Sequence, residues 1–153
     1  MIWRMRQNLS ETLRGMLAEA QKEARLLNQD FVSTEHLLLG VVRCDTCEAA
    51  RALRAAEVDV GELRAALMHV LPRGKEDPVV TGDLPLSPKA QRVINNAIVK
   101  AQSLREKQVT TRLVVLALLD EQDTALRRAF RETGADMDLL TRKLAERPVP
   151  AEE

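Results

Sequence analysis

Residues 32–50, VSTEHLLLGVVRCDTCEAA, hold two pairs of side chains that could do chemistry. Glu35 and His36 are adjacent, and Cys44 and Cys47 form a Cys-x-x-Cys pair. A carboxylate beside a histidine can act as an acid–base pair, histidine and cysteine bind zinc, and Cys-x-x-Cys pairs exchange disulfides. The segment therefore raises three hypotheses: an acid–base site, a zinc site and a redox pair.

The spacing of these residues argues against all three chemistries. A helix from His36 to Cys44 would separate the two pairs by roughly 12 Å, whereas zinc donors lie about 2.0–2.3 Å from the metal. The second histidine, His69, has no Cys-x-x-Cys of its own. A thioredoxin-like site requires a strand before the Cys-x-x-Cys pair, and no strand is expected before Cys47. Adjacent residues on a helix point about 100° apart, so Glu35 and His36 are not expected to act together as an acid–base pair. Glu35 is instead interpreted as a first-turn residue that interacts favourably with the helix dipole, and no metal site is predicted.

Composition points to a helical protein without a strong electrostatic field. Of the 153 residues, 45% are apolar but only 2% are aromatic, which favours close helix packing over sheets. Lysine and arginine equal aspartate and glutamate at 23 each, so nothing attracts nucleic acid or an anionic membrane. No apolar run approaches the length of a membrane span, and the N-terminus lacks a secretory h-region. We expect a soluble, cytoplasmic protein.

The Gly74-Lys75 dipeptide does not belong to a nucleotide-binding loop. Such a loop needs a glycine five positions earlier and a serine or threonine after the lysine, and those positions hold His69 and Glu76. We therefore predict no catalytic residues, no enzyme activity and no cofactor.

The chain contains an internal repeat at a constant shift of 77 residues, from Leu9 to Leu86. Units of this kind stack when neither can bury its apolar face alone. The sequence predicts an all-α single domain over 1–153, with repeat one at 9–71 and repeat two at 86–146. The matched pairs include Ser10 and Ser87, Ala24 and Ala101, Val32 and Val109, Thr34 and Thr111, Leu63 and Leu140, and Leu67 and Leu144.

Each repeat is predicted to form four helices, related by pseudo-two-fold symmetry. The second helix of each is apolar nearly all round, so it should be buried at the centre. Residues 72–85 contain three prolines and two glycines and should form an exposed loop, and 147–153 should be a frayed tail. The predicted helices are about 10–27, one that begins after Ser33 or Thr34 and runs through EHLLLGVVR (35–43), 47–57, and one that begins after Asp59 and carries Leu63, Leu67 and Leu71, then 88–106, 111–120, 122–133 and 137–146.

The stretch AQKEARLLNQDFVSTEHLLLGVVR resembles the N-terminal (Clp repeat) domain of Clp ATPases, especially of the ClpC type. The family pattern is an Ala-Gln/Glu-x-x-Ala helix followed by Gly-Thr-Glu-His-Ile-Leu-Leu-Gly. Ser33 replaces the first glycine, and Arg112 and Leu113 stand where the second repeat of the family has Glu and His. The resemblance covers about residues 7–146. The matching residues are Ala20, Gln21, Ala24, Thr34, Glu35, His36, Leu37, Leu38, Leu39 and Gly40.

The resemblance implies a double Clp N motif that binds adaptors and substrates without catalysis of its own. It also implies a pocket in each repeat for a phosphorylated arginine, here formed by Thr34 and Glu35. Thr111 and Arg112 take these places in repeat two, where Arg112 would repel a guanidinium or instead bind a carboxylate. The expected partners are Clp ATPase or peptidase subunits and adaptor or substrate proteins.

Two alternative functions remain open. The chain could be a free-standing accessory subunit that docks on a Clp machine and regulates it. Cys44 and Cys47 could instead make it a redox- or metal-responsive protein. For Glu35 itself, a purely structural place at a helix start competes with ligand binding.

Overall fold

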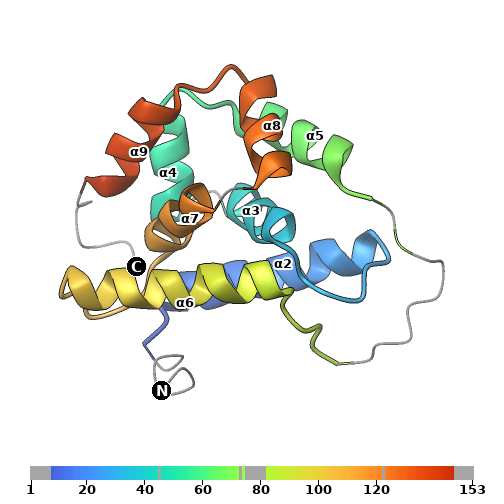
Figure 1. The fold of residues 1–153 in the computed structure, drawn as a ribbon, viewed down its shortest axis with the longest axis horizontal. Coiled ribbons are helices and arrows are strands. Elements are labelled where there is room, and N and C mark those ends of the chain that lie inside the picture. Colours follow the sequence, from blue (N-terminus) through green and yellow to red (C-terminus); the bar gives the residue numbers. More distant parts are fainter. Residues whose placement is uncertain (1–7, 45, 73, 75–81, 122, 147–153) are drawn as a thin grey trace.

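A computed structural model of the chain describes residues 8–44, 46–72, 74, 82–121 and 123–146, and these residues form eight helices. The all-α, two-repeat prediction is confirmed (Figure 1). Much of the predicted loop (73 and 75–81) and the whole predicted tail lie outside the described residues. The helices are α2 (Glu11–Leu26), α3 (Thr34–Arg43), α4 (Glu48–Ala55), α5 (Val60–Val70), α6 (Pro88–Ser103), α7 (Thr111–Asp120), α8 (Thr124–Glu132) and α9 (Met137–Ala145).

The shift of 77 residues extends to the residues that cap the helices. Ser10 and Ser87 each accept a hydrogen bond from the backbone N–H three residues later, at the starts of α2 and α6. Asp59 and Asp136 do the same for α5 and α9. Because a cap satisfies an N–H group that the helix itself cannot, these matched residues start matched helices.

The backbone also repeats where the helices end. Asn28 and Arg105 have positive φ angles of 54° and 55° at the ends of α2 and α6. Glu57 and Gly134 have φ angles of 62° and 71° after α4 and α8. Residues other than glycine rarely adopt this left-handed backbone conformation, so its recurrence reflects one turn geometry used in both repeats.

Two short parallel bridges join the repeats where their chains run extended. Leu9 pairs with Val109, and Val32 pairs with Leu86. The hydrogen bonds match as well: Ser10 N–H donates to the Val109 carbonyl at 2.9 Å, and Ser87 N–H donates to the Val32 carbonyl at 2.8 Å. Each repeat therefore gives one extended residue to each bridge, which is the pairing that pseudo-two-fold symmetry requires.

The third and fourth helices of each repeat pack against those of the other repeat. Within a repeat, α2 packs on α3 and α6 packs on α7. Across the repeats, α4 of repeat one packs on α9 of repeat two, and α5 packs on α8 (Figure 1). One continuous core results, with the apolar helices α3 and α7 buried inside it. At Gly40 a Cβ atom would lie 2.6 Å from the Met16 carbonyl oxygen, so glycine permits the close approach of α3 to α2.

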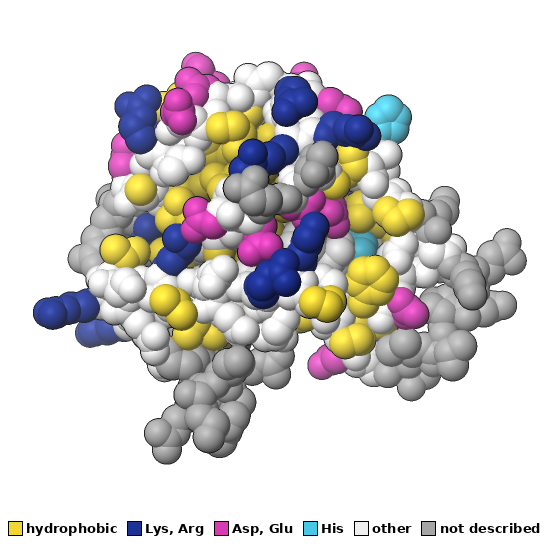
Figure 2. All heavy atoms as spheres, in the orientation of Figure 1, with side chains coloured by type: hydrophobic (Ala, Val, Ile, Leu, Met, Phe, Trp, Pro, Cys, Tyr) yellow, Lys and Arg dark blue, Asp and Glu magenta, His cyan; other side chains and the backbone are white. Residues whose placement is uncertain are grey.

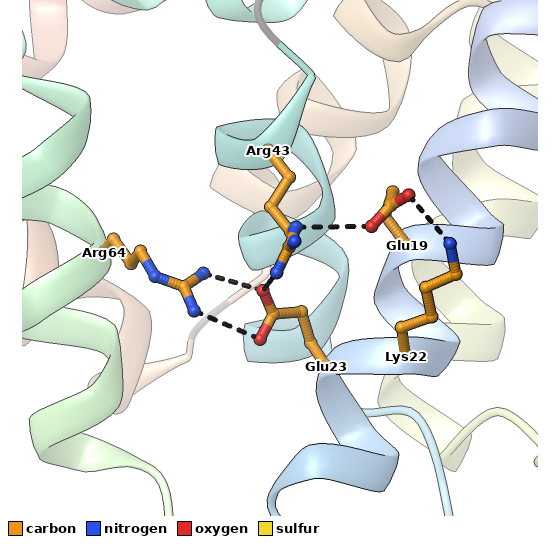
Figure 3. Close-up of polar contacts among 5 residues, drawn as sticks. All are labelled: Glu19, Lys22, Glu23, Arg43 and Arg64. Carbon is orange, nitrogen blue, oxygen red and sulfur yellow. Dashed lines mark hydrogen bonds and ion pairs between the residues drawn. The ribbon is translucent and has the colours of Figure 1, made fainter.

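An ion-pair network links the first, second and fourth helices of repeat one (Figure 3). The Glu23 carboxylate, 1% exposed, accepts hydrogen bonds from Arg64 at 2.7 Å and from Arg43 at 3.0 Å. Burial alone would raise the pKa of Glu23, but the two arginines outweigh it and hold that pKa below its ordinary value. The matching pair in repeat two is Lys100 and Asp120 at 2.7 Å, with the charges reversed and Asp120 60% exposed.

This difference in burial predicts unequal stability effects. Glu23→Gln should lower the free energy of unfolding by about 1.5–3 kcal/mol, because charge-assisted bonds in a buried setting are lost. Asp120→Asn, the matched change in repeat two, should cost at most about 1 kcal/mol, because its ion pair is exposed. Urea unfolding of the two variants measures both values, and equal effects would show that the network contributes no more than a surface pair.

Candidate functional site

The first candidate site lies where the N-termini of α3 and α8 meet. Thr34 opens α3, is 2% exposed, and donates its hydroxyl hydrogen to Asp123 Oδ2 at 2.8 Å. Asp123 is the N-cap of α8, and its Oδ1 accepts the N–H groups of Ala125 and Leu126 at 3.0 and 3.2 Å. Lys89 Nζ lies 3.8 Å from Asp123 Oδ2. The site thus combines residues of both repeats and contains a buried carboxylate between two positive helix ends.

Glu35 occupies the first turn of α3, beside Thr34, and is half-buried. Within the part of the chain that the structure describes, its carboxylate has neither a hydrogen bond nor an ion pair. A carboxylate in this position benefits from the helix dipole and keeps its acceptor positions open. It can therefore receive a cationic group from outside the chain.

The His36 side chain is engaged with the backbone at the start of α3. The Ser33 side chain accepts the His36 N–H, and the His36 ring Nδ1 accepts the Ser33 N–H at 2.9 Å, which completes a capping box. Burial lowers the pKa of His36 to about 4, against the opposing charge of Glu23. A histidine here takes the role that Glu or Gln usually fills at this position of a capping box.

The second candidate site lies where the N-termini of α7 and α4 meet. Thr111 is fully buried, and its hydroxyl oxygen accepts the Ala49 N–H at 3.2 Å. Arg112 is 4% exposed and donates from Nη2 to Glu106 at 2.8 Å and from Nη1 to the Leu144 carbonyl oxygen at 3.0 Å. Its Nε lies 3.5 Å from a carboxylate oxygen of Glu48, in an ion pair.

The structure therefore places the four predicted residues in two separate sites of different character. Thr34 and Glu35 lie together at the first, and Thr111 and Arg112 at the second. The sequence-based expectation that Arg112 repels or binds an incoming group stays a prediction, and the enclosure of its guanidinium argues for a role inside the fold. Sequence reasoning missed Asp123, which the predicted helix 122–133 had placed inside a helix. An aspartate followed by Thr-Ala-Leu is an N-cap signal that could have identified it.

Cys47 lies where thiolate chemistry is disfavoured. Cys47 is fully buried, its Sγ donates to the Cys44 carbonyl oxygen at 3.4 Å, and burial raises the pKa of its thiol to about 12. Reactive thiols have lowered pKa values, so this environment opposes a redox role. Among the described residues, no group of three His, Cys, Asp or Glu side chains is arranged to hold a metal ion.

Comparison with known proteins agrees with this architecture. The chain matches the family of the Clp repeat (R) N-terminal domain over residues 8–133 and again over 90–147, and it belongs to that family. It is 28% identical over 144 residues to the ATP-dependent Clp protease ATP-binding subunit ClpA homolog of Cyanidium caldarium. That match spans 92% of this chain but only 17% of the relative's length.

Two solved structures share the fold. The N-terminal domain of the chaperone ClpD from Arabidopsis thaliana has a TM-score of 0.75 at 23% identity, covering 90% of this chain and 92% of that one. A complex of the ClpV N-domain with a VipB peptide has a TM-score of 0.75 at 16% identity, covering 100% of this chain and 95% of that one.

The lowered pKa of His36 predicts a loss of stability in acid. Above its ordinary pKa of 6.5 the ring is neutral in both the folded and unfolded chains, whereas below 6.5 only the unfolded chain gains the proton until about pH 4. The free energy of unfolding should fall by about 2 kcal/mol between pH 7 and pH 5. Urea unfolding across this pH range measures the effect.

The two histidines give matched variants for this test. His36→Gln, which preserves a capping-box acceptor, should remove most of the pH dependence. His69→Gln, at an exposed position, should leave it unchanged. A pH dependence that persists in His36→Gln would assign the effect to other groups.

Proposed function

We propose that this chain is a non-catalytic, protein-binding module of a Clp unfoldase–protease system, and that it recognises adaptor or substrate proteins through the Glu35 site. Membership of the Clp repeat family supports a place in such a system. The ClpV N-domain of the same fold is solved with a VipB peptide, which supports protein binding as the activity. The observation that carries the choice of site is the open, half-buried carboxylate of Glu35 at a helix start.

The chemistry of the Glu35 site suits a ligand that carries both charges. The carboxylate can pair with a guanidinium in bidentate fashion. The adjacent N-terminus of α3 favours an anion such as a phosphate. A phosphorylated arginine joins these two groups in one side chain, so we propose it as a recognition signal within a bound protein.

Charge on the surface gives no support for nucleic acid as a partner. Figure 2 shows Lys and Arg side chains interspersed with Asp and Glu over the face in view, and the formal net charge is zero. None of the described helices is long and apolar enough to cross a membrane. A cytoplasmic location stays a prediction, as does the alternative function of an accessory subunit that docks on the machine itself.

Replacing Glu35 tests the proposed site. Glu35→Gln should weaken binding of a phosphoarginine peptide about ten-fold or more, because a charge-assisted contact contributes roughly 1.5–3 kcal/mol. Isothermal titration calorimetry measures the change.

The matched control is Glu11→Gln, which removes an exposed first-turn carboxylate from α2. Both variants should lose a similar small amount of stability, about 0.3–1 kcal/mol, through the helix dipole. Only Glu35→Gln should lose binding. Wild-type affinity in Glu35→Gln, or no binding by the wild type, would reduce Glu35 to a structural residue.

A further inference from the structure

The guanidinium of Arg112 is enclosed on three sides by groups that the chain supplies. Glu106, in the loop before α7, holds Nη2 at 2.8 Å, and Glu48 of α4 lies 3.5 Å from Nε. The Leu144 carbonyl oxygen near the C-terminus of α9 accepts from Nη1 at 3.0 Å. From this geometry we infer that repeat two contains a guanidinium-binding site whose occupant is the chain's own Arg112.

Two of the enclosing groups accept hydrogen bonds from the guanidinium, and Glu48 adds an ion-pair contact at Nε without a hydrogen bond. The N–H donors of a guanidinium lie in a plane and point outward, so acceptors must meet them from several directions. Two carboxylates supply negative charge opposite the guanidinium, and the carbonyl belongs to the last turn of a helix, where it lacks a helical partner and carries partial negative charge. Glu48 is 9% exposed and the Glu106 side chain 19%, so the cation is shielded from water where such contacts are strongest.

Repeat one shows the opposite arrangement at the matched position. Glu35, 77 residues before Arg112, is a half-buried carboxylate with no cation from the described residues. The first site therefore offers an anion to an external cation, whereas the second has already received a cation from within. This conclusion rests on the proposed function for the first site, and it makes the domain monovalent for a phosphoarginine ligand.

A guanidinium site can be distinguished from an ordinary buried ion pair by rescue with a small molecule. Arg112→Ala removes the guanidinium and leaves its acceptors in place. Ethylguanidinium, added at millimolar concentration, should then raise the melting temperature of the variant by several degrees or restore its folding. It should not raise that of the wild type, whose site is filled. Ethylammonium at equal concentration should not substitute, because it lacks the planar set of donors.

A second variant ties the rescue to the site. Arg112→Ala combined with Glu106→Gln should lose most of the response, because the closest carboxylate is neutralised. Absence of rescue in Arg112→Ala, including a variant that stays unfolded with and without ethylguanidinium, overturns the inference. Equal rescue by ethylammonium also overturns it, since any cation would then suffice.

Calorimetry of the wild-type protein with a phosphoarginine peptide separates this inference from the proposed function. Binding of one peptide per chain is the expected result, and binding of two shows that the second site is open, which contradicts the inference. If the wild type binds no peptide but ethylguanidinium still rescues Arg112→Ala, the proposed function fails and the internal guanidinium site stands.

Discussion

The structure depends on the burial of apolar helix faces across the boundary between the two repeats. Four helices of 8 to 16 residues are too short to enclose a core alone, and the pairing of α4 with α9 and of α5 with α8 closes it from both sides. Leu53 and Phe130, at matched positions in α4 and α8, are both essentially fully buried. Burial of such a side chain contributes about 1.5–3 kcal/mol to the free energy of unfolding. The packing of helices across the repeats therefore supplies much of the stability of the chain.

The same packing across the repeats determines where the two candidate sites lie. The N-terminus of α3 meets α8 through the bond from Thr34 to Asp123, and the N-terminus of α7 meets α4 through the bond from Ala49 to Thr111. Both sites are therefore assembled from two repeats, and each repeat could change its own contribution. Repeat one presents a carboxylate at its site, and repeat two fills the equivalent place with Arg112. The ion pair of Glu23 with Arg43 and that of Lys100 with Asp120 have their charges reversed, so the repeats differ in sign at a second matched position as well.

Much of the fold could be predicted from the sequence because its signals are local and repeated. Caps such as Ser10 and Asp59 mark helix starts, and one shift of 77 residues aligns both halves. Helix partners could not be predicted, because periodicity shows that a face is buried but not which helix covers it. The burial of Arg112 was missed for the same reason. A charged side chain is buried only when it is paired, and one of its partners, Glu48, lies in the other repeat.

The most direct test of this account is to separate the two repeats. Residues 1–77 and 78–153 would be produced as separate chains and followed by circular dichroism during urea unfolding. Each half alone should lack a cooperative transition, because α4 and α5, or α8 and α9, have lost their partners in the other repeat. An equimolar mixture should recover helix content and cooperative unfolding. A cooperative transition in either isolated half, with the helix content of the intact chain, would contradict helix packing between the repeats as the basis of the fold.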